Sequence, residues 1–174
     1  MPAPKKISNK LYDEYTMQGK IPMGFCYRDD SSQEIQKMIN SNFTQKEFDK
    51  CIKRIKKKEY NYYMDTDLWL YDALEKYPIK GKHVCIMGSA YPWYEAMAIV
   101  YGAAKCTVIE YSDRKSFHPK IEYIKPEEEI SQQFDVCFSI SSFEHDGLGR
   151  YGDPLNPNGD LETMKKLKTL LKKD

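Results

Sequence analysis

The alternation of apolar and polar stretches over residues 82–111 predicts a strand, a turn, a helix and a second strand. Val84–Met87 is apolar without alternation, as expected of a strand that is buried on both faces. Gly88 ends this run, and a second apolar run, Cys106–Ile109, ends at the acidic residue Glu110. Between them, apolar residues recur at helical spacing and form one face: Trp93, Ala96, Met97, Val100 and Tyr101.

The ends of this helix carry the residues that helix ends favour. Pro92 suits the first turn, where its missing N–H is harmless. Gly102 follows the last apolar residue and is expected to close the helix. The whole unit is typical of an α/β fold of the nucleotide-binding kind.

The rest of the C-terminal half predicts two more strands. Ile121–Ile124 alternates and is a candidate third strand, and Phe134–Ile140 is an apolar fourth strand. The acidic stretch from Pro126 to Ser131 is expected to form a short helix. Residues 141–160 contain four glycines and two prolines and are expected to form a long functional loop. A last helix is expected from Asn158 or Asp160, with these residues facing inward: Leu161, Met164, Leu167 and Leu171.

The N-terminal third predicts an irregular segment followed by two helices. Residues 1 to about 43 are irregular but apolar, which indicates either a strap across the core or a lid over a substrate pocket. Thr44 and Glu47 form a capping box that opens the first helix, whose expected inner face is Phe48, Cys51, Ile52 and Ile55. Asp65 or Thr66 is expected to cap the second helix, which Pro78 stops; its expected inner face is Leu70, Ala73, Leu74 and Tyr77.

These elements predict one Rossmann-like α/β fold. We expect a mostly parallel sheet of strand order 3-2-1-4 with helices on both faces, because crossover connections are right-handed. Residues 65–174 would form this partial domain, and residues 1–64 a helical N-terminal extension.

Charge and cysteine usage restrict the partners. The formal net charge of the 174 residues is +1, so we expect no nucleic-acid binding. The five cysteines are odd in number and lack a CxxC pair, and there are three histidines. Buried free thiols in a reducing compartment are therefore favoured over disulfides, and we expect no metal site.

Hydropathy restricts the location. No apolar run approaches the roughly 18 residues of a membrane span, and the first residues lack the apolar region of a signal peptide. We therefore expect a soluble, cytoplasmic protein without a membrane partner.

Two features can bind a nucleoside where the strands end. Gly88, Ser89 and Ala90 can let the backbone approach a ligand, and Glu110 can accept hydrogen bonds from both ribose hydroxyls. Ligands bind outside the carboxyl ends of parallel strands, so Gly88 and Glu110 should lie side by side. The alternatives are a simple turn and an exposed acid, and the dinucleotide fingerprint GxGxxG is absent.

The loop after the fourth strand carries a second group of candidates. His145 lies between Glu144 and Asp146, and a histidine beside carboxylates can accept a proton near neutral pH. The alternative is a loop histidine with no chemical role. Arg150 and Tyr151 can orient a polar substrate, whereas hydrogen bonding within a turn explains Asp153 almost as well.

The order of these parts resembles class I S-adenosylmethionine-dependent methyltransferases. More closely, MGSAYPWYEA, VIEYS and SISSFEHDGLGRYGDPLNPNGD resemble the nematode-type domain of unknown function family 268, over roughly residues 60–174. The resemblance implies S-adenosylmethionine as cofactor. It also implies that Gly88 and Ser89 line its methionine end, that Glu110 holds its ribose, and that the segment from Ser141 to His145 borders cofactor and substrate.

The chain departs from the methyltransferase pattern in two ways. Ile86 stands where the pattern has an acid, and Ala90 replaces the second glycine. The fold also needs three more strands after the last helix, so we expect Phe134–Ile140 to be an apolar edge. Such an edge favours self-association or pairing with another chain, and we expect weak turnover by this chain alone.

The leading functional prediction is methyl transfer from S-adenosylmethionine to an oxygen or nitrogen of a small polar or sugar-like acceptor. His145 or Glu144 would remove the acceptor's proton. The alternatives are a non-catalytic fold relic that binds a partner chain through its open edge, and another nucleotide or nicotinamide binder, which the missing glycines disfavour.

Overall fold

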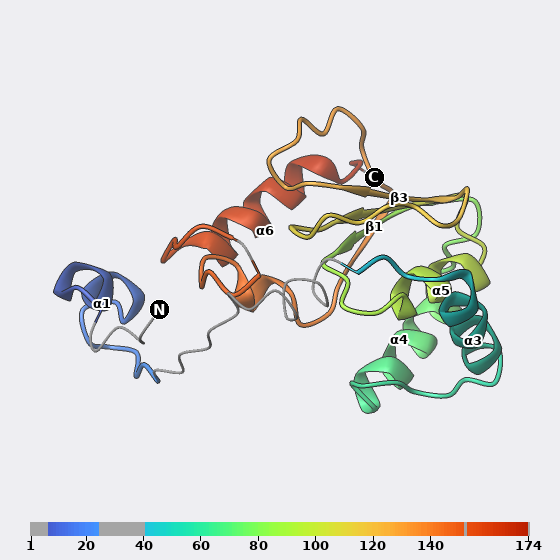
Figure 1. The fold of residues 1–174 in the computed structure, drawn as a ribbon, viewed down its shortest axis with the longest axis horizontal. Helices are drawn as coiled ribbons and strands as arrows, with labels where there is room; N and C mark the ends of the chain where they lie inside the picture. Colours follow the sequence, from blue (N-terminus) through green and yellow to red (C-terminus); the bar gives the residue numbers. More distant parts are fainter. Residues whose placement is uncertain (1–6, 25–40, 152, 174) are drawn as a thin grey trace.

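The computed structural model describes residues 7–24, 41–151 and 153–173. Its centre is a four-stranded sheet in which all neighbours are parallel, in the order β3-β2-β1-β4 (Figure 1). The strands are β1 (His83–Met87), β2 (Lys105–Ile109), β3 (Ile121–Ile124) and β4 (Val136–Ser139). The α/β class, the Rossmann-like sheet and the strand order 3-2-1-4 are thereby confirmed.

The buried central strands divide their side chains between two cores. Val84 and Ile86 of β1 point into the larger core, whereas Cys85 and Met87 point into the smaller one. Side chains alternate across a strand, so an unbroken apolar run supplies both faces of a covered sheet. Helices therefore cover both faces, as expected.

Three helices cover the larger core: α3 (Gln45–Ile55), α4 (Asp65–Lys76) and α5 (Trp93–Val100). They lie together on one side of the sheet in Figure 1. The predicted capping box is confirmed, since the backbone N–H of Thr44 donates to Glu47 at 2.8 Å and the backbone N–H of Glu47 donates to the Thr44 hydroxyl at 3.2 Å. Gly102 closes α5 as predicted, with φ +86°.

Helix α6 (Gly159–Leu170) lies on the opposite side of the sheet, where Leu167 and Leu170 pack on the smaller core (Figure 1). The predicted inner face is wrong in its first half, because Leu161 and Met164 are 47% and 52% exposed. That end of the helix packs on the loop after β4 through Gly159, where an added Cβ would lie 2.8 Å from the backbone of Asp146.

The predicted face of α4 is confirmed for Leu74, which is buried, and Leu70, which packs on the larger core, and is wrong for the other two residues. Tyr77 is 65% exposed and Ala73 is exposed, whereas Tyr71 and Leu74 are buried. The inner face also contains a polar residue that the hydrophobic pattern does not reveal: Asp67 is fully buried and accepts a 2.9 Å hydrogen bond from the Tyr94 hydroxyl.

Three local predictions in the chain's irregular parts are wrong. The N-terminal segment contains a helix, α1 (Asn9–Tyr15), whose cap is the Ser8 side chain. Residues 126–131 form a short turn and irregular backbone instead of a helix, and Glu128 accepts a 2.6 Å hydrogen bond from the backbone N–H of Lys125 across the turn. A short 3₁₀ helix, η1 (Phe143–His145), follows β4 instead of a plain loop.

The apolar residues of the N-terminal segment divide into two groups. Tyr12, Met17 and Ile21 are exposed, so they do not cover the core. Phe43 is buried and packs on Phe117 at 6.3 Å between ring centroids. Two apolar residues of the proposed strap or lid, Phe25 and Tyr27, lie outside the described residues.

The fourth strand is shorter than predicted, and its outer edge is partly covered. Phe134 forms an isolated parallel bridge with Leu171, with its N–H donating to the carbonyl of Leu170 at 2.8 Å. Within the described residues, Val136–Ser139 pairs only with β1. Self-association through this edge stays a prediction.

Two further expectations concern free thiols and membrane-spanning segments, and both can be compared with the described residues. Cys51, Cys85 and Cys106 are buried and free, and Cys137 is free and half-buried. In the described ranges, no helix combines the length and the apolar character that crossing a membrane requires.

Candidate functional site

The glycine turn at the end of β1 is built on a left-handed backbone. Gly88 has φ +70°, a conformation that favours glycine, and its N–H donates to the carbonyl of Ile109 at 2.9 Å. A Cβ at Gly88 would lie 3.1 Å from the Ser142 hydroxyl oxygen. The turn therefore lies directly beside the segment that follows β4.

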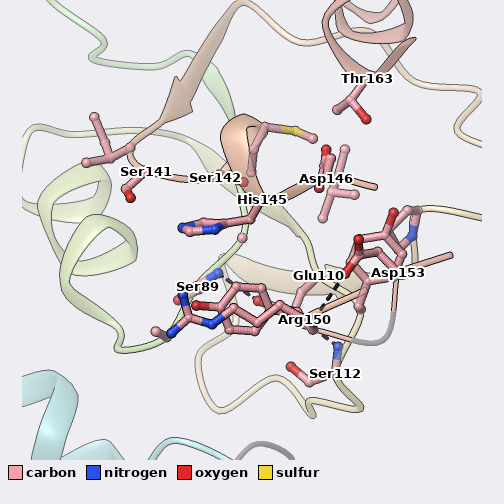
Figure 2. A pocket seen from close by; sticks show the side chains of 18 of the residues that line it. Ser89, Glu110, Ser112, Ser141, Ser142, His145, Asp146, Arg150, Asp153 and Thr163 are labelled. Carbon is pink, nitrogen blue, oxygen red and sulfur yellow. Dashed lines mark hydrogen bonds between the residues drawn. The ribbon is translucent and has the colours of Figure 1, made fainter. Parts of the chain in front are cut away.

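Glu110 lies beside this turn, as the sequence predicts. Its Oε2 accepts a 2.7 Å hydrogen bond from the N–H of Ser89, and its Oε1 accepts a 3.2 Å bond from the N–H of Ser112. Figure 2 shows these two bonds converging on the carboxylate. Each carboxylate oxygen has two acceptor sites, so Glu110 keeps capacity for further donors such as ribose hydroxyls.

A cleft of about 1330 Å³ opens above these residues. This exceeds the roughly 300–1,000 Å³ of a typical small-molecule site, so it has room for two ligands side by side. Nine of the ten predicted site residues line it: Gly88, Ser89, Ala90, Glu110, Ser141, His145, Asp146, Arg150 and Tyr151. The tenth, Glu144, does not.

The far wall of the cleft is the segment after β4. Ser141 has φ +50°, which is uncommon for a residue with a side chain and often marks functional sites. It leads into η1, so that His145 comes to the cleft and Glu144 stays exposed outside it. Burial tends to raise the pKa of Glu144, but hydrogen bonds from Ser141 and the backbone outweigh it and lower this pKa.

In Figure 2, His145 lies between the labelled Ser141 and Ser142 on one side and Ser89 on the other, with Asp146 to its right. Its ring contacts Tyr151 edge to face, with centroids 5.5 Å apart, and the Arg150 guanidinium lies 5.0 Å from the Tyr151 ring centre. Burial raises the pKa of Asp146, against a hydrogen bond from Thr163. Histidine, carboxyl, guanidinium and phenol therefore meet at one end of the cleft.

Asp153 fixes the shape of this loop. It is 6% exposed, and its Oδ2 accepts 2.8 Å bonds from the N–H groups of both Gly147 and Gly149. Its Oδ1 accepts a 3.1 Å bond from the N–H of Tyr151. The interpretation that Asp153 makes hydrogen bonds within a turn is confirmed.

The N-terminal helix α1 also contacts this loop. The Tyr15 hydroxyl of α1 donates a hydrogen bond to the carbonyl of Gly147.

Sequence reasoning missed Glu95, which lies beneath the glycine turn. It is 0% exposed, it accepts hydrogen bonds from the hydroxyls of Ser89 and, at 3.1 Å, Tyr123, and its Oε2 has no partner. Burial raises the pKa of Glu95 to about 7. The available signal was a lone acid inside the apolar run Trp93–Val100.

A tyrosine wall was also missed. Tyr62, Tyr63 and Tyr94 line the cleft opposite the η1 segment. Asp67 accepts a 2.7 Å bond from the N–H of Asn61 as well as the Tyr94 hydroxyl, so it fixes this wall. The signal was Asp67 on an otherwise amphipathic helix.

The arrangement can hold a polar nucleoside against the strand ends and a second small molecule beside His145. Among the described residues, no group of three or more His, Cys, Asp or Glu side chains is arranged to hold a metal ion.

Comparison with known proteins identifies a family without an assigned activity. No curated protein matches the chain. Residues 81–174, slightly more than half of the chain, match the family described as "Caenorhabditis protein of unknown function, DUF268". The match spans the sheet, the glycine turn, Glu110 and the whole loop after β4. The chain therefore belongs to the DUF268 family.

Proposed function

We propose that this protein binds S-adenosylmethionine in the cleft and transfers its methyl group to an oxygen or nitrogen of a small polar or sugar-like acceptor. One observation carries the proposal: Glu110, at the end of β2, lies within 2.7 Å of the Ser89 N–H that follows the β1 glycine turn. In parallel α/β sheets, an acid in this position accepts the hydroxyls of a ribose.

The residues around the turn fit this cofactor. Gly88 leaves room for close approach because it has no side chain, and Glu110 retains acceptor capacity beyond its two backbone bonds. Ser141 and Ser142 supply hydroxyls from the opposite wall. Glu95 is buried beneath the turn and does not line the cleft itself, so it would act on a cationic sulfonium through its charge and not by contact.

The cofactor would supply an electrophilic methyl group, and the chain's residues would do the rest. Arg150, Tyr151 and Asp146 would orient the acceptor, and His145 would accept the acceptor's proton as its oxygen or nitrogen is methylated. Glu144 was the second candidate base. Its position outside the cleft favours His145.

Calorimetry with S-adenosylmethionine tests the binding step. The wild-type protein should bind, and Glu110→Ala should bind about 10- to 150-fold more weakly, the scale of a lost charge-assisted hydrogen bond. Glu129→Ala is the matched control, because Glu129 is exposed and is not a lining residue of the cleft. Absence of binding to the folded wild type would contradict the proposal and favour a non-catalytic, partner-binding protein.

Methyl transfer needs a separate assay. Protein that binds the cofactor would be incubated with methyl-labelled S-adenosylmethionine and neutral sugars, nucleosides and small phenols. Label in a product that depends on His145 would support transfer. Binding without label in any acceptor would restrict the function to cofactor binding.

A further inference from the structure

At the start of the helix that follows the glycine turn, two backbone N–H groups are already hydrogen-bonded within the chain and one position has no N–H. In dinucleotide-binding folds, the pyrophosphate lies at the N-terminus of the helix after the first strand and is held by unpaired backbone N–H groups. Here the N–H of Ser89 is bound to Glu110 and that of Trp93 donates to the carbonyl of Tyr91 at 2.7 Å. Pro92 has no N–H.

Glu95 adds a negative charge at this helix end. It lies in the first turn of α5, and its carboxyl accepts a hydrogen bond from its own backbone N–H. Its Oε1 also accepts the hydroxyls of Ser89 and Tyr123, while its Oε2 is buried without a partner. The chain's own carboxyl therefore occupies the end of the helix dipole that would otherwise favour an anion.

We propose that Glu95 is a specificity-determining residue, which makes the Gly88 turn accept nucleosides with a neutral or cationic 5′ substituent and reject 5′-phosphates. This inference rests on the proposed function, because it assumes that a nucleoside ribose lies at Glu110. Two like charges brought together in a site of low dielectric repel strongly. A sulfonium at the same place is attracted instead.

The groups that face Glu95 come from several elements. One positive charge acts on Glu95: Arg114, a lining residue of the cleft, lowers the pKa of Glu95 without cancelling the effect of burial. The other ionisable groups that interact with it are the Tyr123 phenol and the thiols of Cys51 and Cys106. All three are neutral near pH 7, because burial raises the pKa of each.

Nucleosides that carry neutral, anionic and cationic 5′ substituents test the proposal. Adenosine, AMP and S-adenosylmethionine would be titrated by calorimetry into the wild type, Glu95→Gln and the control Glu129→Gln at pH 8. Wild type and control should bind AMP at least about tenfold more weakly than adenosine. Glu95→Gln, which keeps shape and removes charge, should bring the two affinities to within about threefold.

A pH series on the wild type covers the case in which Glu95→Gln does not fold. NAD has no phosphate proton to gain between pH 6 and pH 8, so only the protein's charge changes. Its affinity relative to adenosine should rise severalfold at pH 6, where more of Glu95 is protonated.

Two results would overturn the inference. One is equal affinity of the wild type for AMP and adenosine. The other is a preference that neither Glu95→Gln nor the lower pH alters. If S-adenosylmethionine and adenosine bind in either case, the proposed function survives and only the role of Glu95 is wrong. If neither nucleoside binds to the folded wild type, the proposed function and this inference fail together.

Discussion

The carboxylate of Glu110 accepts a 2.7 Å hydrogen bond from the backbone N–H of Ser89, and this bond joins the ends of β2 and β1. The two residues are 21 positions apart and meet because parallel strands end at the same edge of the sheet. Glu110 thus stabilises the glycine turn whether or not it also holds a ligand. Variants of Glu110 must be compared for folding as well as for binding.

Glu110→Gln separates these two roles. The amide oxygen can still accept the Ser89 N–H, whereas the Ser112 N–H loses its acceptor on the other carboxylate oxygen. The turn should therefore remain folded, with a thermal midpoint lowered by a few degrees. The lost negative charge should weaken S-adenosylmethionine binding by roughly 1.5–3 kcal/mol. Differential scanning fluorimetry and calorimetry measure the two effects, and equal binding by a folded variant would exclude Glu110 as the ribose acceptor.

Gly88→Ala should destabilise the protein and weaken cofactor binding. The residue has φ +70°, and the new Cβ would lie 3.1 Å from the Ser142 hydroxyl. Gly81→Ala is a matched control, since Gly81 has φ +77° and nothing within 4 Å of an added Cβ. We expect about 1–2 kcal/mol from backbone strain in both variants and an additional loss only at Gly88. Equal urea-unfolding free energies would show that the Ser142 contact is unimportant.

His145→Ala should lower methyl transfer by roughly 10²–10⁴-fold while cofactor affinity stays within a few-fold. The reason is that His145 lines the acceptor end of the cleft, beside Asp146 and Tyr151. Glu144→Gln should have a much smaller effect, because Glu144 is not among the lining residues. Initial rates with saturating cofactor compare the two, and a larger effect at Glu144 would reverse the assignment.

Asp153→Ala should loosen the loop after η1 without unfolding the sheet. The carboxylate is the acceptor for the N–H groups of Gly147, Gly149 and Tyr151, so its removal leaves three donors without their partner. Hydrogen exchange at these amides should accelerate at least tenfold, on the scale of 1.5–3 kcal/mol for bonds to a charged group. Asp153→Asn keeps one acceptor oxygen, so its exchange rates should lie between those of the wild type and Asp153→Ala. Unchanged exchange in the alanine variant would contradict this role.

Hydrophobic patterning predicts the sheet well because buried parallel strands are apolar without interruption. The runs at Val84–Met87 and Cys106–Ile109 fall within β1 and β2, and the acid at Glu110 meets the Gly88 turn as expected. The end of each apolar run is visible in the sequence. Because parallel strands end at a common edge of the sheet, the residues after two such runs can be expected to lie side by side.

Buried polar residues account for much of what the sequence did not predict. Asp67 can lie on the inner face of α4 because its carboxylate accepts hydrogen bonds from Asn61 and Tyr94, which come from outside this helix. Glu95 in the first turn of a helix is usually read as a surface acid that complements the dipole. Its burial depends on Ser89 and Tyr123, which only the folded chain brings to it.

Burial of Glu95 should make stability fall as the pH rises. Its pKa is about 7 in the folded protein, against 4.5 as the ordinary value, so the folded state binds more protons than the unfolded state between these limits. The stabilisation from this group is complete below pH 4.5 and is lost progressively up to about pH 7, by roughly 3 kcal/mol.

Urea unfolding of wild type and Glu95→Gln at pH 5, 6, 7 and 8 isolates the effect, because all other groups are shared. The difference between the two proteins should shift in favour of Glu95→Gln as the pH rises, whereas Glu129→Gln should stay parallel to wild type. A difference that is constant with pH would mean that the Glu95 carboxyl titrates as if exposed.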